Sequence, residues 1–241
     1  MRIAILADIH ANLPALEAVL SHLEQQECDL TYHAGDLIAI GPYPSEVVDL
    51  AMTRPILSVQ GNHDGWVVRG LPTDPIPGMD DNELMHQHWT HSRLDQGRRD
   101  FIKAMPHAID EVHEGVRILV VHFALENDGK SLKSVNERGR EEEILECFGC
   151  PEADIVCFGH LHSRPFSKSY GGTHFLNPGS VGCSHDGFAN YAIVETSDGK
   201  FSVTEHRVPY DREALLARYD ELEIPARRFI RRCFFGVEWD D

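Results

Sequence analysis

Five apolar runs in this chain each end in a polar motif that a strand end does not by itself require. The five motifs are Asp8-Ile9-His10, Gly35-Asp36, Gly61-Asn62-His63-Asp64, His122 and Gly159-His160-Leu161-His162. Helical patterns separate the first three runs, and this alternation is typical of parallel β-α-β units. Because ligands bind outside the carboxyl ends of strands in open parallel sheets, we expect the five motifs to meet in one crevice. The chain is therefore predicted to be an α/β protein with a ligand site at that edge.

Hydrophobic periodicity predicts the individual elements. Strands are expected over 2–7, 30–34, 56–59, 108–113, 116–121 and 154–158, with short strands and Gly turns over 165–207 and a hairpin turn at Asp198-Gly199. Helices are expected over 13–27, 46–52, 82–105, 137–147, 212–221 and 226–235. Gly, Pro and Asp make 65–80 a predicted loop.

The chain of 241 residues contains no linker and no fixed-period repeat. We therefore expect a single domain over 1–241. The polar helix that follows the loop is expected to form a cap insertion at about 65–105. Two C-terminal helices should close the chain at about 211–236.

The formal net charge of −17 argues against a broad phosphate-binding face for nucleic acid, which needs clustered Lys and Arg. It does not argue against a small anionic substrate held by metal ions. No apolar run approaches the ~18–20 residues of a membrane helix, so no membrane partner is expected and a cytoplasmic location is predicted. The six cysteines are then expected to be reduced thiols.

The residues at the strand ends are of the types that bind transition metals. The Asp8/His10 and His160/His162 pairs are two residues apart, which on an extended backbone places both side chains on one face. Together the strand ends supply two Asp, one Asn and four His, with His63 to spare. Imidazole, carboxylate and amide ligands suit Mn²⁺, Fe or Zn²⁺ rather than Ca²⁺. No cysteine takes part, which argues against a structural zinc site.

In this order, the five motifs resemble the calcineurin-like metallophosphoesterase superfamily. The segment Asn177-Pro178-Gly179-Ser180 is similar to a turn in its small bacterial and archaeal phosphodiesterase branch. The resemblance implies a four-layer α/β/β/α sandwich, in which two mixed sheets pack face to face with helices outside.

The resemblance also implies the role of each motif residue. One metal ion would be held by Asp8, His10, Asp36 and His162. Asp36 would bridge to a second ion, held also by Asn62, His122 and His160. Two such ions, Mn²⁺ being favoured and Fe, Zn²⁺ or Ni²⁺ the alternatives, can share a water and aim it at phosphorus. His63 would be catalytic, stabilising the transition state or assisting the leaving group.

The expected activity is hydrolysis of a small phosphoester, and a phosphodiester is favoured. Phosphatases of the superfamily carry a longer second motif, GDxxDR, whereas Leu37-Ile38-Ala39-Ile40 follows Asp36 here. A phosphomonoesterase, including a protein or nucleotide phosphatase, is the alternative. A catalytically silent scaffold is disfavoured because every ligand and His63 are present. Apolar positions in the last helices are compatible with a homo-oligomer.

Three further groups of residues have ordinary structural interpretations. His86, His88 and His91 lie on the predicted polar helix, where a solvated cap surface is expected. Cys147 and Cys150 have the spacing of half a zinc site but no second pair, so buried or partly buried thiols are expected. Four arginines have the spacing of a solvated helix face, and pairing with acidic neighbours is the equal alternative: Arg227, Arg228, Arg231 and Arg232.

Overall fold

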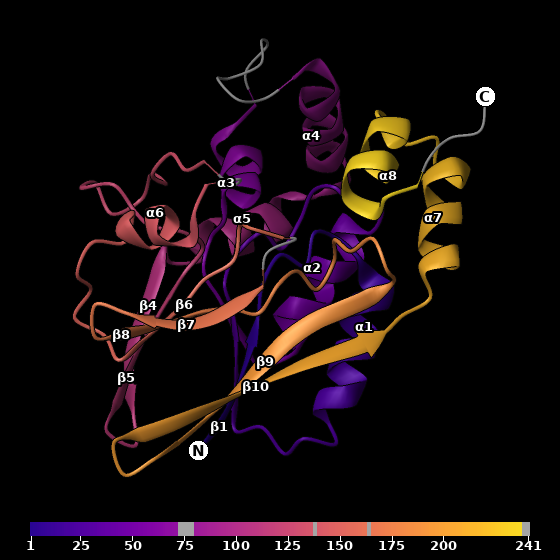
Figure 1. The fold of residues 1–241 in the computed structure, drawn as a ribbon. Helices are drawn as coiled ribbons and strands as arrows, with labels where there is room; N and C mark the ends of the chain where they lie inside the picture. The colour runs from indigo at the N-terminus through magenta and orange to yellow at the C-terminus, as the bar shows by residue number, and fades with distance from the viewer. Residues whose placement is uncertain (72–79, 137–138, 163–164, 238–241) are drawn as a thin grey trace.

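The computed structural model describes residues 1–71, 80–136, 139–162 and 165–237, and its strands form two five-stranded mixed sheets (Figure 1). The first sheet has the order β10 (Lys200–Pro209), β9 (Phe188–Ser197), β1 (Arg2–Leu6), β2 (Leu30–His33) and β3 (Ile56–Ser58). The second has the order β4 (Ala108–His113), β5 (Val116–Val121), β6 (Ile155–Cys157), β8 (Thr173–Asn177) and β7 (Phe166–Tyr170). Parallel pairing joins β1 to β2 to β3 and β5 to β6 to β8. Each sheet thus contains three parallel strands whose carboxyl ends can carry a site.

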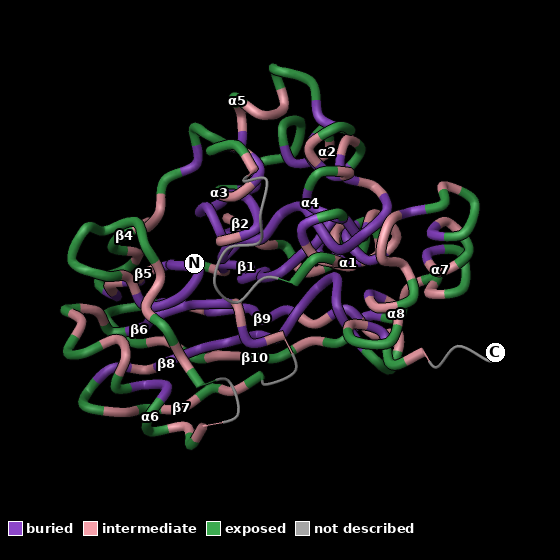
Figure 2. The backbone as a smooth tube through the Cα atoms, turned by 90° about the horizontal axis from the view of Figure 1, so that it is seen from above, coloured by how far each residue is buried: buried purple, intermediate pink, exposed green. Residues whose placement is uncertain are grey.

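The two sheets pack face to face because their central strands are apolar on both faces. Ile3 and Ile5 of β1 share one buried cluster with Ile118 and Val120 of β5. The alternate residues of β1 face the other way, into a second cluster with the helices. Buried backbone accordingly lies in the middle of the molecule, while exposed stretches lie along the outer helices and turns (Figure 2).

Helices cover the outer face of each sheet and complete the four layers. On the first sheet, α1 (Leu13–Leu23) and α2 (Pro44–Thr53) contribute to the outer cluster. On the second, α6 (Glu141–Glu146) buries Ile144 and Leu145. The predicted α/β/β/α sandwich is confirmed. Helices α1 and α6 are shorter than predicted, and part of the segment predicted for α6, residues 137–138, lies outside the described residues.

The segment after β3 differs from its prediction. Helix α3 (Asn62–Arg69) includes residues 65–69 of the expected loop, because a helix starts after Gly61 with Asp64 in its first turn. The expected single helix over 82–105 is two helices, α4 (Asp81–Arg93) and α5 (Gln96–Ala104). Leu94 follows the end of α4, and Asp95 caps α5 by accepting a hydrogen bond from the backbone N–H of Arg98 at 2.9 Å. The rest of the expected loop, 72–79, lies outside the described residues.

Two C-terminal helices pack beside this region (Figure 1). Helices α7 (Arg212–Glu221) and α8 (Arg227–Phe235) bury Leu215, Ile230 and Phe235 in a cluster with Ile40 and Cys183. Their main apolar side chains therefore pack within the chain, and a homo-oligomer stays a prediction. The division into one domain with a cap also stays a prediction. Among the described residues, no helix combines the length and apolar character needed to cross a membrane.

Candidate metal centre

All seven residues predicted as metal ligands lie just beyond the carboxyl ends of five strands. Residues 8 and 10 follow β1, residue 36 follows β2, and residue 62 opens α3 after β3. Residue 122 follows β5, and residues 160 and 162 follow β6. Because the two sheets are packed face to face, the strand ends of both meet at one place. The structure brings the predicted residues together, in two groups.

The first group consists of Asp8, His10, Asp36 and His162. Each offers one ligand atom, and these atoms all lie within 4.8 Å of one another. Nε2 of His162 lies 2.8 Å from Nε2 of His10 and 3.5 Å from Oδ1 of Asp8. Nε2 of His10 lies 3.7 Å from Oδ2 of Asp36. Two imidazoles and two carboxylates around one point are a donor set that fits a divalent transition metal.

The second group consists of Asn62, His122 and His160. Oδ1 of Asn62 lies 3.0 Å from Nε2 of His122 and 3.2 Å from Nδ1 of His160. Nε2 of His122 also lies 3.3 Å from Oδ2 of Asp36. The same carboxylate oxygen thus faces both groups, and Asp36 has the position of a bridging ligand.

Backbone carbonyls orient two of the imidazoles. Nδ1 of His10 lies 3.2 Å from the carbonyl oxygen of Ile38, and Nδ1 of His122 lies 2.8 Å from that of Ala34. A carbonyl oxygen can only accept, so each Nδ1 carries the proton and donates it. Nε2 of each ring is therefore the atom directed toward the centre, which is the arrangement that metal-binding histidines use.

Burial and charge set the ionisation of the centre. Burial lowers the pKa of His160 to about 3, which keeps this ring neutral and available as a ligand. Burial is the largest single influence on His122 and lowers its pKa, but the charge and hydrogen bond of Asp36 and the charge of Asp8 together raise it to about 9. Burial raises the pKa of Asp36, yet the charge of His122 holds it well below its ordinary value. A buried carboxylate in this setting favours a nearby cation, so the electrostatics of the site also fit a metal.

The Asp8/His10 and His160/His162 pairs were predicted to share a face because residues two apart do so on extended backbone, and this prediction of the backbone is wrong. Asp8, His10 and His160 have φ angles of 54°, 49° and 69°, so they lie in the left-handed region and not on extended backbone. The loop after each strand turns sharply and points the side chains inward. Such backbone conformations cost about 1–3 kcal/mol each and persist where the surrounding structure enforces them.

The motif glycines are explained by lack of space. A Cβ atom on Gly61 would lie 2.1 Å from Oδ1 of Asp36, and one on Gly159 would lie 2.7 Å from Oδ2 of Asp8. Gly35 has a φ of +88°, and a Cβ there would lie 2.7 Å from Nδ1 of His122. These three positions accept only glycine because the side chain of a predicted ligand occupies the space beside each one.

Asp64 is a site residue to which the sequence reasoning gave no role. Its carboxylate accepts hydrogen bonds from the backbone N–H groups of Gly61, Asp36, Leu37 and Ile38, at 2.9–3.2 Å. It therefore ties the loop that carries Asp36 to the start of the helix that carries Asn62. An acidic residue three positions after a possible N-cap, here Gly61, is typical of a helix start and could have indicated this role.

His63 also lies at the centre, but on its cap side. Its Nε2 is 4.0 Å from Oδ2 of Asp36 and 3.9 Å from Oε1 of Glu83, and its Nδ1 is 2.5 Å from Nε2 of Gln87. An amide nitrogen can only donate, so Nδ1 accepts and Nε2 of His63 carries the ring proton. Burial lowers the pKa of His63, which favours this neutral form. His63 thus presents an N–H group, flanked by two α4 residues that the sequence reasoning did not identify.

The other histidines of α4 only partly match their prediction. His88 is exposed and His91 is half-buried, but His86 is buried and is not part of a solvated surface. The difference arises because α8 covers that side of α4, as the residues lining a shared cavity show. Burial lowers the pKa of His86 to about 3.

The sequence also led to predictions for the state of the cysteines and for the pairing of the α8 arginines. All six cysteines are unpaired. Cys147 is half-buried as expected, but Cys150 is exposed. The expectation that no cysteine takes part needs a correction, because the Cys183 sulfur lies within 4.8 Å of ring nitrogens of His10 and His162 at the edge of the first group. Arg227 and Arg231 pair with Asp220 at 3.4 Å and 2.7 Å, which matches the alternative of pairing with acidic neighbours.

Comparison with known proteins places this site in a family context. Residues 1–199 match the model of the calcineurin-like phosphoesterase superfamily domain. Over 226 residues, the chain is 28% identical to an uncharacterized protein of Methanocaldococcus jannaschii, MJ0912, covering 87% of this chain and 88% of the relative.

Two solved structures are similar over almost the whole chain. A metallophosphoesterase from Sphaerobacter thermophilus is 28% identical with a TM-score of 0.72, covering 98% of this chain and 99% of that one. The hypothetical protein PH1004 from Pyrococcus horikoshii is 20% identical with a TM-score of 0.81, covering 99% of each chain. The similarity to PH1004 concerns the fold alone. The similarity to the Sphaerobacter thermophilus protein extends beyond the 199 residues of the family model, into the C-terminal helices.

Proposed function

Because the chain belongs to the calcineurin-like phosphoesterase superfamily, we propose that it is a binuclear metal-dependent hydrolase whose substrates are small phosphodiesters. One observation carries the proposal: six nitrogen and oxygen donor groups from four strand ends form two groups that meet at the Asp36 carboxylate, which follows a fifth strand. The family implies divalent metal ions, and this donor set suits Mn²⁺, with Fe, Zn²⁺ and Ni²⁺ as alternatives.

In the proposed site, Asp8, His10 and His162 would hold one ion, and Asn62, His122 and His160 would hold the other. Asp36 would belong to both sets of ligands. When bound, the ions supply an activated water and positive charge that neutralises the phosphoryl oxygens. The remaining steps belong to the protein.

His63 is the proposed catalytic side chain. Its Nε2–H group lies next to Asp36 and is held in this protonation state by Gln87. An N–H donor fixed beside the centre stabilises negative charge on a leaving oxygen as the bond to phosphorus breaks. His63 is therefore proposed to act as a hydrogen-bond donor to the leaving group and not as a metal ligand.

The preference for a diester rests on the segment after Asp36. Leu37, Ile38, Ala39 and Ile40 are buried and apolar, so this segment offers no charged group to a dianionic phosphomonoester. A diester carries one negative charge fewer and needs less neutralisation. A phosphomonoesterase is the second candidate function, supported by the general chemistry of the centre.

The experiment that tests the proposal compares two chromogenic substrates. Hydrolysis of bis(p-nitrophenyl) phosphate and of p-nitrophenyl phosphate is measured with added Mn²⁺ and with a chelator. We expect metal-dependent turnover with a higher kcat/KM for the diester. A preference for the monoester would favour the phosphatase function. No turnover by protein shown to contain two metal ions would contradict a hydrolase and favour the scaffold alternative.

A further inference from the structure

A small cavity of ≈ 70 Å³ lies between α4 and α8, directly beside His63. Its lining includes the aromatic residues Phe229 and Phe234 and the polar residues Glu83, Gln87 and His63. Figure 1 shows α8 standing next to α4 on this side of the molecule. Because His63 lines both the cavity and the metal centre, a group bonded to phosphorus at the centre can extend into the cavity.

Two acceptor groups belong to the polar wall of this cavity. Glu83 has a half-buried carboxylate, and its Oε1 lies 3.9 Å from Nε2 of His63. Burial and the negative charges of Asp80 and Asp36 raise the pKa of Glu83 to about 7, and a cation bound nearby would lower it again. Oε1 of the fully buried Gln87 has no hydrogen-bond partner among the described residues. Buried acceptors without partners are costly, and a bound donor would relieve that cost.

The combination of groups indicates the chemistry of the ligand. A carboxylate and an amide oxygen accept hydrogen bonds from an ammonium group, and aromatic rings attract the same cation through their faces. The size of the cavity limits the ligand: since a water-sized probe needs roughly 10–15 Å³, only about five heavy atoms can enter. The cavity thus fits a short chain that ends in an ammonium group.

We propose that this cavity binds the ammonium end of a short amino alcohol that is esterified to the phosphoryl group of the substrate. The inference rests on the proposed function, because the ester oxygen must lie at His63. Nε2 of His63 and Oε1 of Glu83 are 3.9 Å apart. An ester oxygen bound to the first atom and an ammonium bound to the second, with parallel hydrogen bonds of about 2.8 Å, lie about 3–4 Å apart. A two-carbon amino alcohol in staggered conformations spans about that distance.

The test uses two probes of equal size that differ in charge. Binding of 2-aminoethyl phosphate and of propyl phosphate to the Mn²⁺-loaded full-length protein is measured by calorimetry. We expect the wild type to bind 2-aminoethyl phosphate about tenfold more tightly, as a charged hydrogen bond implies. Glu83→Gln should reduce this ratio to about one. Asp81→Asn, which removes an exposed negative charge from the same helix, is the matched control and should keep the tenfold ratio.

Several outcomes would overturn the inference. Equal binding of the two probes by the wild type would show an apolar cavity without cation preference. A tenfold ratio that survives Glu83→Gln, or failure of both probes to bind, would also overturn it. Should Glu83→Gln fail to fold, Phe229→Leu provides a second variant, which should lower the ratio about threefold by removing a ring face.

The same experiment separates this inference from the proposed function. A retained tenfold ratio in wild-type protein that does not hydrolyse bis(p-nitrophenyl) phosphate would contradict the hydrolase and support the cation subsite. Hydrolysis of that diester by protein that binds 2-aminoethyl phosphate and propyl phosphate equally would support the hydrolase and contradict the subsite.

Discussion

The side-chain amide nitrogen of Gln87 lies 2.5 Å from Nδ1 of His63, so a residue of the α4 helix determines which ring nitrogen of His63 carries the proton. Both side chains are buried. The contact connects α4 to the metal centre through a single hydrogen bond. It also gives α4 a role in the chemistry beyond covering the site.

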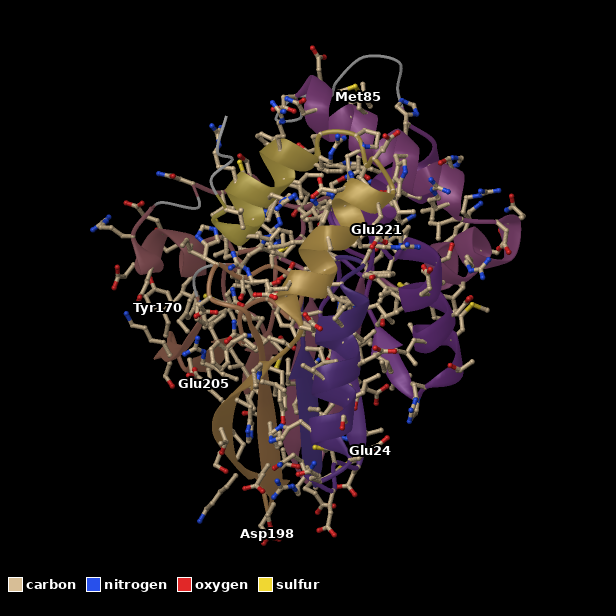
Figure 3. All side chains as sticks on the ribbon, turned by 90° about the vertical axis from the view of Figure 1, so that its right-hand side faces the viewer. Glu24, Met85, Tyr170, Asp198, Glu205 and Glu221 are labelled. Carbon is tan, nitrogen blue, oxygen red and sulfur yellow. The ribbon has the colours of Figure 1, made fainter. Side chains whose placement is uncertain are left out.

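Replacing Gln87 with Met should lower kcat about tenfold with little change in KM, because His63 loses the donor that fixes its tautomer. The direct readout is the ¹⁵N spectrum of the imidazoles in metal-free protein, in which Nδ1 of His63 should change from unprotonated toward a mixture of tautomers. Met85→Ala, on the exposed outer side of the same helix (Figure 3), is the control and should leave both measurements unchanged. An unchanged His63 spectrum in Gln87→Met would show that Gln87 does not set the tautomer.

Gly61→Ala should strongly reduce metal binding, because the new Cβ would lie 2.1 Å from Oδ1 of Asp36 and displace that carboxylate. Gly97→Ala makes the same chemical change on α5, where the nearest atom is 3.6 Å away, and should retain metal binding. Metal content after dialysis, measured by elemental analysis, checks both variants. Equal metal content in the two would mean that the Asp36 carboxylate can move without loss of the site.

His63→Ala should retain two metal ions per chain and lower kcat by about 100-fold or more, since a single aimed donor contributes about this much. Steady-state hydrolysis of bis(p-nitrophenyl) phosphate, together with metal analysis, separates the two effects. A rate near that of wild type would remove His63 from the proposed chemistry. Loss of metal would instead make it a ligand.

The stability of metal-free protein should fall in mild acid, in part through His33. This ring is fully buried, and burial lowers its pKa to about 4, so the unfolded chain takes up a proton at a higher pH than the folded one. The contribution of His33 is therefore present above about pH 6.5 and is lost as the pH falls toward 4, by about 2 kcal/mol at pH 5. Urea unfolding at pH 7.5 and pH 5.0 checks this. His33→Gln should lose about 2 kcal/mol less than wild type between the two pH values, and an equal loss would contradict the assignment.

The convergence of the metal-site residues could be predicted because it depends on strand order and strand direction alone. Asp36 and His122 follow strands of different sheets, and packing the carboxyl ends of the sheets together is enough to bring them into contact. The backbone conformation of the loops that follow the strands was not predictable in the same way. The positive φ angles at Asp8 and His160 are enforced by neighbouring loops, and sequence spacing on extended backbone does not describe them.

The cap side of the site depends on tertiary contacts that leave little trace in the sequence. Gln87, Glu83 and His86 belong to a polar helix whose pattern predicts a solvated surface. They become site or core residues because α4 docks between His63 and α8, which is about 170 residues away in sequence from His63. The helix start at Gly61 and Asp64 was missed for the same reason. Their partners, Asp36 and its loop, become neighbours only in the folded chain.

Asp36 is proposed to join two metal sites, and anomalous diffraction from crystals of the Mn²⁺-loaded protein would locate the ions. We expect two anomalous peaks, both beside Asp36, with Asp8, His10 and His162 around one and Asn62, His122 and His160 around the other. Crystals of Asp36→Asn should show neither peak at full occupancy, since the shared carboxylate loses its charge. A single peak in the wild type, or two full peaks in Asp36→Asn, would contradict a shared ligand at Asp36.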